Sequence, residues 1–384
     1  MTKGRPAIIG LGLTPMSVRP GGSAAEFATR ALHTALDDAG LAPTELDGLL
    51  VGSSQGVRPD RVGVALAAQA GLGDLRLVEH VEIKGATTLA MVRRAQLAVD
   101  AGEARTIACV FADAPLRAEG GAGSTYAHSG GNSGLRGLER ASGVLGSVPT
   151  YALLAARWLA VTGGSHDDFG AVAIAARAWA MGNPDAVQRT PLDAAAYRAS
   201  PMVSTPLRRL DCARPVNGAA AVVLGAEVPA NGHAAVRVVG SGRAHPVRRR
   251  RAGGESWFGG GSRAAEDALA EAGMSRDDLD VLELYDPFTV VTLCLLEEYG
   301  FCAPGTAGEL ARSGALAPGG ALPVNTGGGQ LSGFYLQGMT PLVEAVVQLR
   351  GGGGDRQVAG AATALVGGIG GRIDHHACLV LEAA

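Results

Sequence analysis

Apolar positions along the chain follow helical spacing in some stretches and strand spacing in others, and the two kinds alternate. In "ALDDAGLAPTELDGLLV", which begins at Ala35, an alanine-rich helix is predicted to end at Gly40, and a short linker leads into an apolar strand. Glycine commonly ends a helix because it adopts the left-handed backbone conformation at little cost. Helices that alternate with apolar strands are typical of layered α/β folds. The pattern therefore predicts an α/β protein.

This helix–strand pattern occurs a second time. The stretch "ALAEAGMSRDDLDVLEL", from Ala268, repeats the first one and ends its helix at Gly273. A weaker correspondence pairs "TTLAMVRRAQLAVDAGEARTIACVFAD" with "MTPLVEAVVQLRGGGGDRQVAGAATALVGG", each an apolar helix, a glycine turn and a strand. Self-similarity of this kind indicates an internal duplication. We expect an N-terminal half over residues 1–228 and a C-terminal half over residues 229–384.

Between the repeats lies sequence of a different kind. The stretch "AEGGAGSTYAHSGGNSGLRGLERASGVLGS", residues 118–147, is rich in glycine and serine and shows no period, which predicts a long loop. Helical segments follow, so the predicted insertion covers about residues 115–205 of the N-terminal half. Long loops in compact proteins are often binding loops or lids. We expect the insertion to cover the functional site.

Composition narrows the class of protein. A chain of 384 residues with 47% hydrophobic and 18% charged residues is typical of a globular protein with two lobes. The net charge of −3 argues against nucleic acid as a partner, and no apolar run reaches the roughly 18 residues of a membrane span. The N-terminus lacks a signal-peptide pattern, and the five cysteines form no CxxC pair. We expect a cytoplasmic protein with neither a disulfide framework nor a metal site.

Two tyrosines stand where α/β proteins bind ligands, beyond the carboxyl ends of strands and near helix N-termini. The strand "DVLEL" delivers Tyr285, after which Asp286 can cap a helix and Pro287 can occupy its first position. Tyr335 occupies a comparable junction, where the glycine-rich stretch "NTGGGQLSGFYLQG" leads into a helix. Each could be a half-buried ring bonded to a neighbour. Their matching positions make Tyr285 and Tyr335 the candidate acid–base groups.

Other charged candidates have simpler interpretations. Lys84, the only internal lysine, could form a Schiff base, but Glu82 on the same strand face could pair with it. The run Arg248–Arg251 could contact phosphates or lie in a solvated loop. Asp374–His376 is not expected to bind a metal, because adjacent strand residues face opposite ways. His128 is expected to be exposed in the glycine-rich loop.

The chain resembles the thiolase superfamily, specifically its sterol-carrier-protein thiolase and lipid-transfer-protein branch. The resemblance rests on "LYDPFTVVTLCLLEEYGFCAPGTAGE", "PVNTGGGQLSGFYLQG", "PLRRLDCARPVNGAAAVVLG" and the duplication, and it covers almost the whole chain. It implies two mixed five-stranded sheets with helices between and around them, in an αβαβα arrangement. It also implies a homodimer that acts on acyl-CoA thioesters, with coenzyme A as part of the substrate and no separate cofactor.

The departures from the thiolase pattern concern its chemical positions. The nucleophilic cysteine of thiolases falls on Gly85, the histidine before "DCF" on Tyr285, the "GHP" histidine on Tyr335, and the second cysteine at or near Leu365. None of the five cysteines falls at a matching position. A covalent acyl-enzyme needs a thiolate. Thiolytic cleavage or condensation through such an intermediate is therefore not expected.

The two-tyrosine pattern is similar to that of the lipid-transfer-protein type aldolases, which shorten steroid side chains. This implies a retro-aldol cleavage of a β-hydroxyacyl-CoA, which needs a base, donors that hold the enolate and an acid. Tyr285 would take the hydroxyl proton and Tyr335 would protonate the enolate carbon, and the reverse assignment is also open. Pro287 and Gln337 replace histidines common in that subfamily, which leaves the substrate open. The expected substrate or oxyanion-binding residues are Gly85, Gly327, Gly328, Gly329, Gly367 and Gly368.

Two other functions remain open at this point. The chain could be a non-catalytic acyl-CoA or sterol-binding subunit, or an acyltransferase or condensing enzyme without a cysteine in a biosynthetic pathway. The retention of paired tyrosines favours an enzyme, since a dead site would be expected to lose them. The resemblance further implies a small partner protein with an OB-fold and a zinc ribbon, which docks on the thiolase-like dimer.

Overall fold

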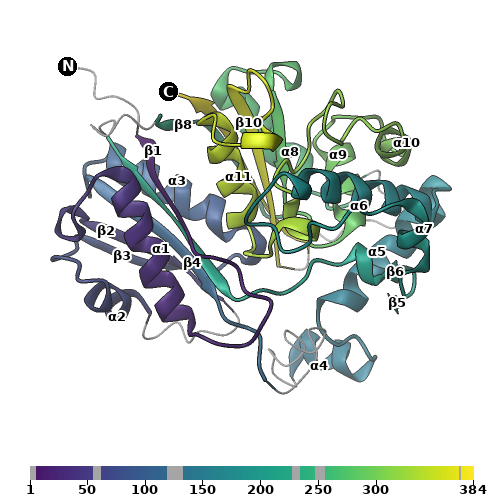
Figure 1. Cartoon of the computed structure of the whole chain (residues 1–384), viewed down its shortest axis with the longest axis horizontal. Coiled ribbons are helices and arrows are strands. Elements are labelled where there is room, and N and C mark those ends of the chain that lie inside the picture. The colour runs from purple at the N-terminus through teal and green to yellow at the C-terminus, as the bar shows by residue number, and fades with distance from the viewer. Residues whose placement is uncertain (1–5, 55–61, 119–132, 227–233, 247–255, 372) are drawn as a thin grey trace.

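Apart from the insertion, the described residues of the N-terminal half form five strands of the sheet and three α-helices. They lie at the left of Figure 1. The computed structural model describes residues 6–54, 62–118, 133–226, 234–246, 256–371 and 373–384. The elements of this half are β1 (Ala7–Leu13), α1 (Ala24–Ala39), β2 (Gly48–Gly52), α2 (Val62–Gln69), β3 (Leu77–Val81), α3 (Thr87–Asp100), β4 (Thr106–Asp113) and β7 (Gly218–Gly225).

The C-terminal half repeats this order of elements. It comprises β8 (Val236–Ala244), α8 (Gly261–Ala272), β9 (Val281–Leu284), α9 (Thr289–Glu298), α10 (Ala307–Arg312), α11 (Met339–Leu349), β10 (Thr363–Gly370) and β11 (His375–Ala383). The corresponding helices α1 and α8 both end at a left-handed glycine, Gly40 and Gly273, each with φ 68°. The predicted α/β class and the helix ends are confirmed.

The strands form one mixed sheet, with the order β3-β2-β4-β7-β1-β8-β11-β10-β9. Two five-stranded sheets were expected, and the number differs for two reasons. Only two residue pairs, Ala7–Arg237 and Ile8–Val236, join β1 to β8, and this short contact merges the halves. The fifth strand of the C-terminal half is reduced to a single bridge between Leu282 and Val324. Proline, here the residue before Val324, has no N–H for a strand ladder.

Helices lie between and around the two parts of the sheet. Helix α3 packs against β2, β4 and β7 of one half and against β10 and β11 of the other, and α11 likewise contacts strands of both halves. Helix α1 covers the outer face of the N-terminal strands, and α8 covers β8 and β11. Each helix layer has its own buried apolar cluster. This is the expected αβαβα arrangement.

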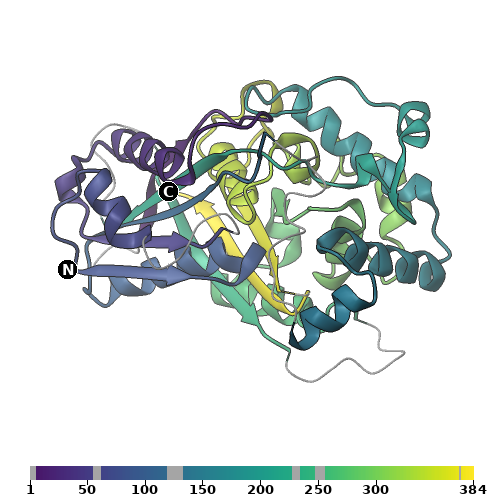
Figure 2. The same ribbon diagram turned by 90° about the horizontal axis from the view of Figure 1, so that it is seen from below.

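The insertion lies between β4 and β7 and packs on the C-terminal half, as Figure 2 shows. It consists of α4 (Gly134–Ala141), α5 (Ser147–Thr162), α6 (His166–Met181), α7 (Ala194–Ala199) and the short strands β5 (Met202–Ser204) and β6 (Leu207–Arg208). Helix α6 contacts α9, α10 and the turn at Gly329–Gly333. The predicted boundary at residue 228 lies outside the described residues.

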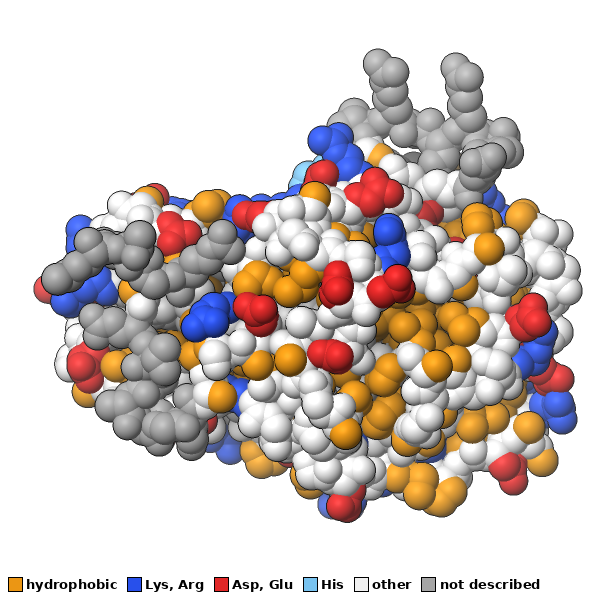
Figure 3. Space-filling view, turned by 90° about the horizontal axis from the view of Figure 1, so that it is seen from above, with side chains coloured by type: hydrophobic (Ala, Val, Ile, Leu, Met, Phe, Trp, Pro, Cys, Tyr) orange, Lys and Arg blue, Asp and Glu red, His pale blue; other side chains and the backbone are white. Residues whose placement is uncertain are grey.

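The charged surface and the lengths of the helices are those expected from the charged and hydrophobic content of the chain. Acidic and basic side chains are interspersed over the described part of the face in Figure 3, with hydrophobic patches between them. No helix in the described parts of the chain is long and apolar enough to cross a membrane.

Candidate active site

Tyr285 and Tyr335 meet at the carboxyl end of β9. Tyr285 directly follows this strand, and its N–H extends the pairing by donating to the carbonyl oxygen of Gly367, at 2.9 Å. Tyr335 follows the turn at Gly329–Gly333, and its backbone forms a bridge with Pro215. The two hydroxyl oxygens are 3.2 Å apart. The structure therefore brings the two predicted acid–base groups into direct contact.

Burial keeps the hydroxyl of Tyr335 protonated. It raises the pKa of this group to about 12, while the hydrogen bond with Tyr285 lowers the pKa by less and the carboxylate of Asp113 raises it slightly. Asp113, at the end of β4, is 1% exposed. A neutral tyrosine can donate its proton and accept another at the same oxygen. The pair can therefore relay protons without a resting phenolate.

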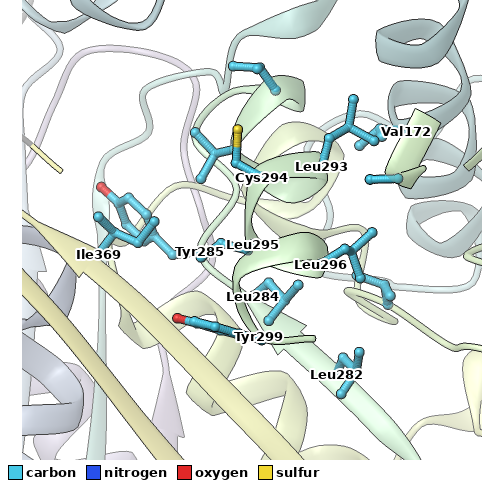
Figure 4. Close-up of a cluster of buried hydrophobic side chains, with 14 of the residues drawn as sticks. Val172, Leu282, Leu284, Tyr285, Leu293, Cys294, Leu295, Leu296, Tyr299 and Ile369 are labelled. Carbon is cyan, nitrogen blue, oxygen red and sulfur yellow. The ribbon is translucent and has the colours of Figure 1, made fainter. Parts of the chain in front are cut away.

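Gly85 lies directly beside the ring of Tyr285. A Cβ atom placed on Gly85 would be 2.4 Å from Cζ of Tyr285 and 2.2 Å from the carbonyl oxygen of Ile369. Figure 4 shows Tyr285 and Ile369 together at one edge of the buried cluster. The tyrosine ring thus occupies the space that a side chain at position 85 would need. A nucleophilic cysteine at position 85 and Tyr285 in this conformation exclude each other.

Asp286 joins the two segments that carry the tyrosines. Its carboxylate is 1% exposed, and its Oδ1 accepts a hydrogen bond from the backbone N–H of Gln330 at 2.7 Å. Gly329 has φ 57°, and a Cβ there would be 2.1 Å from Oδ2 of Asp286. Burial raises the pKa of Asp286 to about 8, against hydrogen bonds from Gln330 and Asn325 that lower it. Asp286 therefore positions the turn before Tyr335 against the end of β9.

A buried pair of glutamates supports the start of the same loop. Oε1 of Glu283 accepts hydrogen bonds from the N–H of Thr326 at 2.9 Å and from its hydroxyl at 2.7 Å. That hydroxyl is also 3.1 Å from Oε1 of Glu344, which accepts from Nε of Arg356 at 2.9 Å. Burial, and then the charge of Glu344, raise the pKa of Glu283. The guanidinium of Arg356 pairs with Glu344, so the protonated form is favoured at Glu283.

The predicted oxyanion glycines are close to protein atoms in this structure. Besides Gly329, a Cβ on Gly327 would be 2.5 Å from Oε2 of Glu344, and one on Gly328 would be 2.5 Å from a side-chain atom of α6. On β10, a Cβ on Gly367 would be 2.6 Å from the ring of Tyr299, and one on Gly368 would be 2.9 Å from the carbonyl oxygen before α3. These glycines allow close packing around the tyrosines. Their role toward an oxyanion stays a prediction.

Sequence reasoning missed an aromatic contribution from the insertion. Tyr151, on α5, stacks on Phe288, with ring centroids 4.4 Å apart and an interplanar angle of 25°. Phe288 lies three residues after Tyr285 and precedes α9. Phe288 lies in the stretch "LYDPFTVVTLCLLEEYGFCAPGTAGE", which the sequence already singles out. The apolar spacing around Tyr151 is that of any buried helix, so it gives no sign of a contact with Phe288. Helix α5 of the insertion packs against the segment that follows Tyr285, and coverage of the site by the insertion stays a prediction.

Other predicted candidates take no part in the tyrosine pair. Lys84 forms an ion pair with Glu82, as the simpler interpretation expected. Within the described residues, no group of three potential ligands could hold a metal ion. His375, in the stretch Asp374–His376, contacts His245, with 2.9 Å between the two Nδ1 atoms. Arg248–Arg251 and His128 lie outside the described residues.

Cys212 lies beside the segment that follows Tyr285, because its backbone forms an isolated β-bridge with Phe288. Its thiol donates to the carbonyl oxygen of Arg208 at 3.4 Å, and burial raises the pKa of the thiol to about 12. All five cysteines are free. A thiol with such a pKa is not a nucleophile at neutral pH.

The chain is similar to several known proteins. Residues 254–383 match the family model described as "Thiolase C-terminal domain-like". The chain is 32% identical to 17-hydroxy-3-oxo-4-pregnene-20-carboxyl-CoA lyase of Mycobacterium tuberculosis, over 91% of this chain and 93% of that protein. It is 29% identical to the steroid side-chain-cleaving aldolase of Thermomonospora curvata, over 91% of each chain. The solved Ltp2-ChsH2(DUF35) aldolase is 28% identical and covers 99% of this chain and 98% of its own, with a TM-score of 0.86.

Proposed function

Because this chain belongs to the family of thiolase-fold lyases that includes the steroid side-chain-cleaving aldolases, we propose that it cleaves a β-hydroxyacyl-CoA by a retro-aldol reaction through Tyr285 and Tyr335. The observation that carries this proposal is the 3.2 Å contact between the two hydroxyls, beside the side-chain-free position 85. The Cα–Cβ bond of the substrate breaks, the β-hydroxyl becomes a ketone, and the remaining fragment leaves as a shortened acyl-CoA.

The two hydroxyls can move the required proton in one relay. Tyr285 takes the proton of the substrate hydroxyl while it passes its own proton to Tyr335, which protonates the α-carbon of the thioester enolate. The tyrosine pair takes one proton from the substrate hydroxyl and gives one proton to the α-carbon. Neither tyrosine therefore needs to be a phenolate before the reaction. This agrees with the raised pKa of Tyr335. The opposite direction through the pair uses the same contact.

The enolate oxygen needs hydrogen-bond donors during this reaction. We assign this role to backbone N–H groups near Gly85 and Gly368, which lie next to each other at the start of α3. The N-terminal end of a helix favours negative charge. The segments Gly327–Gly329 and Gly367 shape the loop and the strand that hold the two tyrosines.

The substrate is proposed to be the thioester of a steroid side chain, and this rests on the names of the two relatives. A small partner protein with an OB-fold and a zinc ribbon is proposed as well, supported by the two-part name of the similar solved structure. A second copy of this chain would pair along β3, an edge strand on which Val78 is 38% exposed.

The direct test is turnover of a branched β-hydroxyacyl-CoA, with the partner protein present, in the wild type and in Tyr285→Phe and Tyr335→Phe. Formation of both a ketone and a shortened acyl-CoA supports the proposal. Tight binding of several such thioesters without cleavage would favour a non-catalytic binding protein.

A further inference from the structure

Two of the described tyrosine hydroxyls lack a hydrogen bond: that of Tyr299, which is fully buried, and that of Tyr151, which is half-buried. Tyr197 donates to Asp211 at 2.8 Å, and Tyr285 contacts Tyr335. Within the described residues, the structure shows no hydrogen bond for the hydroxyl of Tyr151. Tyrosine hydroxyls inside proteins usually find a partner. This half-buried hydroxyl is therefore available to a bound molecule.

Tyr151 reaches the site from the insertion. On α5 it lies on the same helical face as Ala155 and Trp158, which are buried, whereas Leu153 faces outward and is 65% exposed. The ring of Tyr151 is fixed by its stack on Phe288. Its position is thus set by packing, while its hydroxyl makes no hydrogen bond to the residues that the structure describes.

The hydroxyl of Tyr151 is close enough to Tyr335 for the two groups to interact electrostatically. Burial raises the pKa of Tyr151, and Tyr335 and Asp374 raise it further by smaller amounts. Tyr151 is therefore a neutral donor rather than a base. Tyr335 is assigned to the α-carbon of the substrate, and the oxygen closest to that carbon is the thioester oxygen.

We propose that Tyr151 is a third substrate-contacting residue, which donates a hydrogen bond to the thioester oxygen, and that its stack with Phe288 forms an apolar wall along the acyl chain. The choice of oxygen rests on the proposed retro-aldol function. The contact itself does not, because any acyl-CoA that binds here carries the same thioester oxygen.

The test compares Tyr151→Phe, which keeps the stack and removes the hydroxyl, with Leu153→Ser on the outer face of the same helix. Two quantities are measured: kcat for β-hydroxyacyl-CoA cleavage, and Kd for a saturated acyl-CoA that lacks the β-hydroxyl. We expect Tyr151→Phe to lower kcat by about 10-fold or more, because the bond strengthens as the enolate forms. Its Kd should rise about threefold, as for one lost neutral hydrogen bond. Leu153→Ser should change neither.

Thermal unfolding completes the experiment, because among the described residues the hydroxyl has no hydrogen bond to lose. The Tm of Tyr151→Phe is expected to match that of the wild type, whereas a structural tyrosine would lose stability. If the wild type cleaves no thioester but Tyr151→Phe still weakens binding, the proposed function fails and the Tyr151 contact stands. If the wild type cleaves its substrate and Tyr151→Phe leaves kcat and Kd within twofold, the Tyr151 contact is overturned.

Discussion

The hydroxyls of Tyr285 and Tyr335 lie 3.2 Å apart although 50 residues separate them in the sequence. One tyrosine ends a buried strand, and the other follows a glycine-rich turn that is held against that strand end by Asp286. In the proposed function, this contact makes a proton relay of two groups that are individually poor bases at neutral pH. The proposed relay would let a thiolase fold act on thioesters without a nucleophile.

The closeness of Gly85 to Tyr285 predicts a strict size limit at position 85. In Gly85→Ala the new methyl group would be 2.4 Å from Cζ of Tyr285, so the ring or the backbone must move. We expect kcat/KM to fall by about 10²-fold, because proton transfer depends on sub-ångström placement. Gly73→Ala is the matched control, since its nearest neighbour would be 3.4 Å away. Equal activity in both variants would show that the ring has room to move.

A cysteine at position 85 also tests the close contact between this position and the ring of Tyr285. Gly85→Cys places a thiol at the nucleophile position of thiolases, but the ring of Tyr285 occupies that space. We expect neither thiolytic cleavage nor an acyl-enzyme adduct by mass spectrometry. Detection of a stable adduct on position 85 would contradict the geometry.

Asp286 predicts an unusual dependence of stability on pH. Its pKa in the folded protein is raised to about 8, above its ordinary value of 3.8. A raised pKa stabilises the fold below the ordinary value, and this stabilisation is lost as pH rises through about 8. Asp286→Asn carries no titrating proton, so we expect it to gain stability relative to the wild type between pH 5 and pH 9. Urea unfolding at several pH values measures this difference, and a constant difference would show that Asp286 is ionised throughout.

The two buried glutamates are expected to respond differently to neutralisation. Glu283→Gln replaces a protonated carboxyl group and should cost little stability. Glu344→Gln leaves the guanidinium of Arg356, which is 7% exposed, without a carboxylate, and should cost about 3 to 5 kcal/mol. Chemical denaturation of the two variants measures both values. A larger loss in Glu283→Gln than in Glu344→Gln would place the negative charge on Glu283 instead.

The exposed edge strand predicts where two copies meet. Val78→Lys puts a charge on β3, and charged edge residues oppose strand pairing between molecules. We expect a wild-type dimer and a mostly monomeric variant by light scattering at equal concentration. A dimer that persists in the variant would place the contact elsewhere.

Features that depend on local residue types could be predicted from the sequence. Helix ends at Gly40 and Gly273 follow from the conformational freedom of glycine, and the place of Tyr285 follows from a strand that leads into a helix. The contact of Tyr151 with Phe288 depends on how the insertion folds back, and no periodicity encodes that. The same holds for the two-pair contact that merges the sheet, because it is set by packing between the halves.

The measurement that tests the central claim most directly is single-turnover cleavage of a β-hydroxyacyl-CoA by the wild type and by Tyr285→Phe, Tyr335→Phe and the double variant. If the two hydroxyls act as one relay, each single change lowers the rate by about 10²-fold or more, and the double change costs no more than either alone. Losses that simply multiply would show two independent groups. An unchanged rate in all three variants would contradict the assignment of the site.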